Sequence, residues 1–127
     1  MNYTEEYEAS PNGCHITGVL VADDCITLFL DIGKVEIRHI QECCESVTLV
    51  DEPYLDMLID SILLDIDISS ENWTAEEGIA GYTFIRIKTT KGMTDCRFEG
   101  GSNGYYGIEA TARFFVVEGV LFDNEVD

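Results

Sequence analysis

Apolar and polar residues alternate with a period of two along much of the first third of the chain. The alternation is clearest over residues 26–32 and 35–39, and an apolar run at 16–21 precedes it. Turn-forming residues separate these segments at 22–24 and 31–34. A period of two is typical of strands that bury one face. The pattern therefore predicts a three-stranded antiparallel meander.

The middle of the chain changes its period. Residues 46–50 are rich in β-branched side chains and predict a further strand. Two acids and a proline at 51–53 are typical of a helix start, because acids suit the positive end of the helix dipole and proline suits the first turn. Apolar residues then recur at helical spacing from 55 to 62. We therefore expect one short α-helix near residues 53–61.

Beyond the helix the period returns to two. Leu64, Ile66 and Ile68 alternate with polar residues, so a strand is predicted with Asp65 and Asp67 on its outer face. Residues 69–81 are predicted as a long polar loop with Trp73 packed back onto the core. A hairpin of strands is predicted at 82–89 and 93–98. A turn at 100–104 and one or two strands at 105–117 complete the chain.

These elements predict an α+β fold, a mostly antiparallel β-sheet of about seven or eight strands with one short α-helix. The length of 127 residues and a hydrophobic content of 46% suit one domain with one core. The predicted organisation is a polar N-terminal arm at 1–13, a single domain at 14–121 and an acidic tail at 122–127.

Two further features of the composition bear on the compartment. The five cysteines, an odd number with two adjacent, do not form a disulfide framework, which favours free thiols in a reducing cytosol. The polar, acidic N-terminus does not resemble a secretory signal, and no apolar run of about 18 residues is present. We therefore expect a cytoplasmic protein.

Of all features of the composition, charge says most about the partner of this protein. The chain has 25 acids against 7 bases, a formal net charge of −18. No base occurs between Arg38 and Arg86, whereas eleven acids do. Phosphate and anionic lipid would repel such a surface, which argues against direct nucleic-acid and membrane binding. The charge predicts instead a partner with a basic surface. The sequence leaves the oligomeric state open.

His39, Cys43 and Cys44 form the densest cluster of candidate metal ligands. They lack the paired spacings of zinc sites, and alternation places His39 on the apolar face of its strand, so we expect a buried, hydrogen-bonded histidine and no metal. A nucleophilic cysteine needs electropositive surroundings, which this chain opposes. The glycine-rich segment 99–104 lacks the Gly-Lys-Ser/Thr ending of a phosphate loop. Neither enzymatic activity nor a cofactor is therefore expected.

Two short motifs stand out as a pair. They are HIQECCESV at residues 39–47 and GSNGYY at residues 101–106. Together they resemble an uncharacterised domain family of bacteriophages and bacteria, whose members read H-x-Q-D-C-C-E-x-V and S-N-G-Y-Y, with Glu42 here in place of the aspartate. The resemblance covers about residues 14–113. It implies a small phage or prophage accessory protein and transfers no activity. If the chain is encoded by a phage, we expect it in the cytoplasm of the host cell.

Charge and resemblance together favour a protein that acts by binding another protein. In this hypothesis a row of carboxylates, ~6.7 Å apart at alternate strand positions, mimics nucleic acid and inhibits a host defence nuclease, as anti-CRISPR or anti-restriction proteins do. The predicted partner-binding residues are Asp65, Asp67, Glu71, Glu76 and Glu77, followed by Asp51, Glu52, Asp56 and Asp60.

Two alternatives remain at this level. In the first, the acids serve solubility alone, because the primary effect of net charge is on solubility. Otherwise the chain is a ligand-binding, metal-binding or catalytic domain, in which a pocket is lined by His39, Cys43, Cys44, Tyr105 and Tyr106.

The charge generates a direct prediction about nucleic acid. The purified protein should not retard bare DNA or RNA in a gel-shift assay, even at low salt, because no excess of bases is available to displace counterions. Tight association that weakens steeply as salt is raised would contradict the charge argument.

Overall fold

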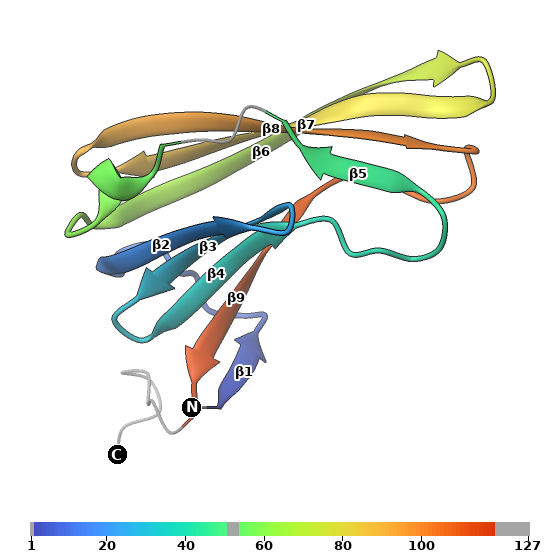
Figure 1. Cartoon of the computed structure of the whole chain (residues 1–127). Helices are drawn as coiled ribbons and strands as arrows, with labels where there is room; N and C mark the ends of the chain where they lie inside the picture. Colours follow the sequence, from blue (N-terminus) through green and yellow to red (C-terminus); the bar gives the residue numbers. More distant parts are fainter. Residues whose placement is uncertain (1, 51–53, 119–127) are drawn as a thin grey trace.

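Two antiparallel β-sheets form the two layers of the computed structural model, which describes residues 2–50 and 54–118 (Figure 1). One sheet has the strand order β1-β9-β4-β3-β2, with β1 at Tyr3–Glu6, β2 at Ile16–Ala22, β3 at Cys25–Leu30, β4 at Gly33–Arg38 and β9 at Thr111–Val117. The other has the order β5-β8-β7-β6, with β5 at Ser46–Leu49, β6 at Leu63–Ala75, β7 at Gly78–Thr89 and β8 at Gly92–Ser102.

One face of each sheet is apolar, and these two faces form a single core. Leu28 and Ile37 from the five-stranded sheet belong to the same buried cluster as Ile85 and Phe98 from the four-stranded sheet. This is the arrangement of a β-sandwich, in which inward-facing residues alternate with outward-facing ones along every strand. The core therefore determines which residues of each strand face solvent.

Several predicted strands are confirmed. The meander is β2, β3 and β4, paired antiparallel in sequence order. The strand predicted at 46–50 is β5, and the hairpin predicted at 82–98 is the central part of β7 and β8. In β3, β4, β7 and β8 the period of two in the sequence coincides with one buried face.

The predicted α-helix is wrong, and with it the α+β class: the part of the chain that the structure describes is all-β. Residues 54–61 form a single 3-10 turn, η1 at Asp56–Leu58, and residues 51–53 lie outside the described ranges. The turn ends where Asp60 adopts a left-handed conformation with φ of 69°. The N–H of Asp60 donates to the carbonyl of Ile16, and the N–H of Ile16 donates to the carbonyl of Ser61. These bonds use backbone groups of Asp60 and Ser61 that a helix would need.

The helical spacing of apolar residues has another cause. Leu55 and Leu58 are buried members of the core cluster, and spacing alone does not distinguish a turn that packs on a core from a helix. No helix in the described residues has the length and apolarity needed to cross a membrane.

The polar loop predicted at 69–81 is also wrong. These residues continue β6 and β7 into a long hairpin with a tight turn at 76–77, and its end projects beyond the neighbouring strands (Figure 1). Trp73 is 42% exposed and does not pack on the core. A hairpin can be polar on both faces where nothing covers it, because its backbone hydrogen bonds are made between its own strands.

The N-terminal segment contributes an edge to the five-stranded sheet. Within the predicted arm at 1–13, β1 pairs with β9, and Arg113 of β9 donates to the Glu5 carboxylate of β1. The predicted tail at 122–127 lies outside the described residues.

Gly33 sits at a point where β4 and β9 approach closely. A Cβ at this position would lie 1.9 Å from the carbonyl oxygen of Phe115, a backbone atom that cannot move without breaking the strand pair. Gly101 in β8 provides a contrast, because a Cβ there would lie 3.7 Å from its nearest neighbour, the Ile79 carbonyl oxygen.

We expect Gly33→Ala to lower the free energy of unfolding by at least ~3 kcal/mol, beyond the usual cost of overpacking, because strand separation must accompany it. Gly101→Ala should change the same quantity by less than about 1 kcal/mol. Urea denaturation followed by circular dichroism measures both. Equal effects of the two substitutions would contradict the close approach of β4 and β9.

Candidate functional site

The first motif folds around the carboxylate of Glu45, whose side chain is fully buried. Its Oε2 lies 2.7 Å from Nε2 of His39 and accepts the backbone N–H of Glu42 at 2.8 Å. Its Oε1 accepts the backbone N–H of Cys43 at 2.9 Å. We call these four residues the Glu45 hub.

The electrostatics of the hub keep Glu45 ionised. Burial by itself raises the pKa of this carboxyl, but the hydrogen bond from His39 and those from backbone N–H groups together lower it to about 2. A buried carboxylate is stable only when such donors replace its water shell.

Both ring nitrogens of His39 have hydrogen-bond partners. Its Nδ1 lies 2.8 Å from the carbonyl oxygen of Glu109, and its Nε2 lies 2.7 Å from the Glu45 carboxylate. The side chain is 8% exposed, which confirms the prediction of a buried, hydrogen-bonded histidine. Because both nitrogens are engaged, neither is free to bind a metal ion.

The second motif meets the first at the hub. The hydroxyl of Tyr106 hydrogen-bonds to the Cys43 thiol, and this bond, followed by burial and the nearby Cys44 and Glu45, raises the pKa of Tyr106. The loop that carries Tyr106 is held by Ser102, whose hydroxyl donates to the Tyr106 carbonyl at 2.9 Å. Two motifs far apart in the sequence thus form one structural unit.

The candidate metal ligands do not converge. Cys43 and Cys44 are exposed, and their sulfur atoms lie 3.0 Å from each other, with His39 already committed to Glu45. No group of three or more His, Cys, Asp or Glu that could hold a metal ion occurs within residues 2–50 and 54–118. His39 lines a hollow of about 200 Å³ with Ile40, Glu42, Gly107, Glu109 and Thr111, but neither cysteine and neither Tyr105 nor Tyr106 takes part in that lining.

The acids predicted to bind a partner are spread along one edge of the molecule. Asp56 is in η1, and Asp60 follows it, 3.7 Å from His15. The others lie in β6 (Asp65, Asp67 and Glu71) and in the turn that follows it (Glu76 and Glu77), while Asp51 and Glu52 lie outside the described residues. Because β6 is 13 residues long, its two ends are ~40 Å apart, and the acids form no single patch.

Residues on the solvent side of the four-stranded sheet, which we call the outer face, form ordered cross-strand rows. One row is Asp67, Arg86 and Asp95, from β6, β7 and β8. Arg86 donates to Asp95 at 2.8 Å, and Lys88 lies 2.7 Å from Asp67. The predicted acidic strand face is therefore largely neutralised at its base by the bases of the next strand.

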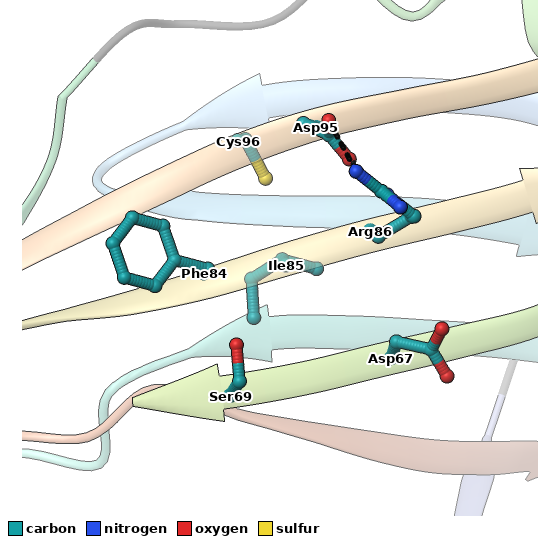
Figure 2. A pocket seen from close by; sticks show the side chains of 7 residues that line it. All are labelled: Asp67, Ser69, Phe84, Ile85, Arg86, Asp95 and Cys96. Carbon is teal, nitrogen blue, oxygen red and sulfur yellow. Dashed lines mark hydrogen bonds and ion pairs between the residues drawn. The ribbon is translucent and has the colours of Figure 1, made fainter. Parts of the chain in front are cut away.

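A shallow pocket of about 430 Å³ lies at this row (Figure 2). Asp67 and Ser69 line it from β6, Phe84 and Arg86 from β7, and Asp95 from β8, together with Ile85 and Cys96. Figure 2 shows the Arg86–Asp95 ion pair on one side of the pocket and the Phe84 ring on the other. Since the charged groups pair with each other, the pocket offers a small ligand few free polar contacts.

Three aromatic side chains form a further row toward the projecting end of the hairpin. Trp73 and Tyr82 are in edge contact at 5.1 Å between ring centroids, and Tyr82 and Phe84 lie 5.8 Å apart. The guanidinium of Arg97 lies over the Tyr82 ring at 4.7 Å. Trp73 and Phe84 remain 42% and 38% exposed. Glu71 and Glu99 flank Tyr82 on either side in the strand register, and both are exposed.

This aromatic row was not predicted from the sequence, because residues 69–81 were assigned to a loop. The signal was present: Glu71 and Trp73, and likewise Tyr82 and Phe84, stand at alternate positions and thus share a face in a strand. What the sequence lacked was any indication that the two segments pair with each other.

The fold and these surfaces define the chain as a two-sheet β-sandwich with an aromatic and acidic outer face and a buried His–Glu ion pair. It belongs to a family described as a domain of unknown function, DUF7448, whose model matches residues 12–112. This agrees with the resemblance to an uncharacterised family. No curated protein and no solved structure matches the chain.

The hub makes stability depend on pH in a defined direction. Because folding lowers the pKa of Glu45 from 4.5 to about 2, its contribution is fully present above pH 4.5 and is lost as pH falls from there toward 2. Glu45→Gln should therefore destabilise the protein at pH 6, and the difference from the unsubstituted chain should shrink steadily below pH 4.5.

Urea unfolding at about pH 6, 4 and 3 measures this difference. Glu42→Gln, in the same loop but with an exposed side chain, is the matched control and should leave the free energy of unfolding nearly unchanged at each pH. A loss in Glu45→Gln that is the same at every pH would show that the carboxylate is not held ionised by the hub.

Proposed function

We propose that this chain is a protein-binding module and that its contact surface is the projecting half of the outer face. We call this surface the aromatic–acidic face; it consists of Glu71, Trp73, Tyr82, Phe84 and Glu99. Its partner presents a basic surface with an apolar centre.

The exposed aromatic row is the observation that carries the proposal. Large aromatic side chains supply most of the binding energy at protein interfaces, especially where Trp and Tyr cluster with Arg at the centre of the contact. Trp73, Tyr82 and Phe84 already contact one another, edge to face and tilted, so little side-chain entropy is lost on binding. They stand on paired strands of a sheet, which is a rigid support.

The distribution of charge supports a basic partner. All seven bases of the chain have partners within it: Lys34 and Arg38 pair with Glu36, Arg86 with Asp95, Lys88 with Asp67 and Arg113 with Glu5, Lys91 donates to a backbone carbonyl, and Arg97 lies over Tyr82. Glu71, Glu76 and Glu77 are exposed at the projecting end and make no ion pair with other described residues.

If the partner is a nuclease, the contacting acids lie at the end of the hairpin and not along the whole of β6. Along β6 the row of carboxylates is interrupted at Ser69, and Lys88 already neutralises Asp67. A phage-type inhibitor of a CRISPR effector or restriction nuclease would use Glu71, Glu76 and Glu77 to contact the basic groove, with the aromatic row as anchor.

Inhibition of DNA cleavage by a panel of CRISPR effectors and restriction nucleases tests this function. Where inhibition is found, Trp73→Ala or Tyr82→Ala should weaken it about 30-fold or more, as expected for loss of a hot-spot aromatic. Tyr54→Ala, at an exposed tyrosine elsewhere, is the control and should have no effect. Full inhibition by both aromatic variants would contradict the assignment of this face.

Charge is tested separately. The triple variant Glu71→Gln, Glu76→Gln and Glu77→Gln should slow association and reduce its dependence on salt, because charge at a rim steers the encounter. The control removes the same charge at other exposed positions, through Glu8→Gln, Asp31→Asn and Glu118→Gln. If both triples behave alike, only the net charge matters and local charge complementarity is excluded.

A further inference from the structure

We propose that Cys43 and Cys44 form a reversible dithiol–disulfide site that exchanges with small disulfides such as glutathione disulfide. The proposal concerns the Glu45 hub and is independent of the aromatic–acidic face.

The geometry of the two thiols is the first support. Their sulfur atoms are 3.0 Å apart, with the Cys43 thiol directed at Cys44, and both residues are exposed. The other cysteines differ, since Cys14 and Cys25 are partly buried and Cys96 is buried. A small disulfide can thus reach the pair at 43–44 before it reaches any other thiol of the described chain.

Hydrogen bonds from the hub and from Gln41 hold the loop that carries the two cysteines in position. Glu45 binds the backbone N–H groups of Glu42 and Cys43. The side-chain amide of Gln41 donates to the carbonyls of Cys43 and Glu45, at 3.0 and 2.6 Å. The conformational entropy of bringing the sulfur atoms together has therefore been lost on folding and does not oppose ring closure.

The exchange balances with glutathione disulfide as the oxidant. The thiolate of one cysteine attacks a sulfur of the small disulfide, which forms a mixed disulfide and releases one thiolate. The second cysteine, as its thiolate, attacks the cysteine sulfur of that mixed disulfide, which closes the Cys43–Cys44 bond and releases a second thiolate. The two protons of the dithiol pass to the two leaving thiolates, and its two electrons reduce the small disulfide to two thiols.

The product is readily reduced, which makes the site reversible. Adjacent residues have Cα atoms only ~3.8 Å apart, shorter than the usual span of a disulfide, so the closed ring is strained. Strained, exposed disulfides are more oxidising than structural ones and serve as labile or regulatory bonds. Excess small thiol should therefore reopen the ring.

Ring closure also has a consequence inside the fold. Oxidation converts the Cys43 thiol, which hydrogen-bonds to Tyr106, into a disulfide sulfur that is bonded to Cys44. Tyr106 belongs to the loop that Ser102 holds. The oxidation state of the pair is thereby coupled to the second motif, which gives both motifs a role in one site.

Mass spectrometry of the intact, reduced protein after incubation with excess glutathione disulfide tests the proposal. We expect the mass to fall by two hydrogen atoms without an added glutathione, peptide mapping to place the bond between Cys43 and Cys44, and dithiothreitol to restore the original mass. Cys43→Ser and Cys44→Ser should each trap a mixed disulfide on the remaining cysteine, whereas Cys25→Ser should close the ring like the unsubstituted chain.

Three results would overturn the proposal: no reaction of the pair, a mixed glutathione disulfide that persists in the unsubstituted chain, or a bond to another cysteine or another molecule. The mapping is made on the unsubstituted protein, so it remains decisive even where a serine variant does not fold. Because it needs no binding partner, its failure is separate from failure of the proposed function.

Discussion

The burial of one apolar face from each of two sheets is the constraint on which the rest of the structure depends. Strands present side chains to opposite faces at alternate positions, so once Ile85 and Ile87 are buried, Phe84, Arg86 and Lys88 must face solvent. The outer face, with its aromatic row and its ion-pair ladder, is thus the obligatory reverse side of the core. A shift of register by one residue would exchange the two sets.

The Glu45 hub binds the backbone of the connection between the two sheets. The connection between β4 and β5 leaves one sheet and enters the other, so its backbone groups have no ladder to join. The buried Glu45 carboxylate accepts those N–H groups and also pairs with the His39 ring. The His39–Glu45 pair therefore organises the crossover and positions the two cysteines next to it. The same geometry that stabilises the loop also creates the setting for thiol exchange.

Charge acts differently at different places on this molecule. Near the base of the outer face Lys88 pairs with Asp67 of β6 and Arg86 with Asp95 of β8, so these charges support the sheet. At the projecting end Glu71, Glu76 and Glu77 are exposed and make no ion pair with other described residues. The effect of an acid on a partner therefore depends on whether a base of a neighbouring strand pairs with it. This is why the aromatic–acidic face has the better claim to bind a partner than the acid row alone.

The sequence by itself determined the meander, the hairpin of β7 and β8, the buried state of His39 and the family, because period-two patterns, turn residues and motifs are local signals. Only the tertiary structure decided that residues 54–61 contain a 3-10 turn packed on the core, and that 69–81 extend a hairpin. It alone joined His39 to Glu45 and brought Tyr106 to Cys43. These outcomes depend on pairing between segments, Ile16 with Ser61 or β6 with β7, whose energies no local pattern contains.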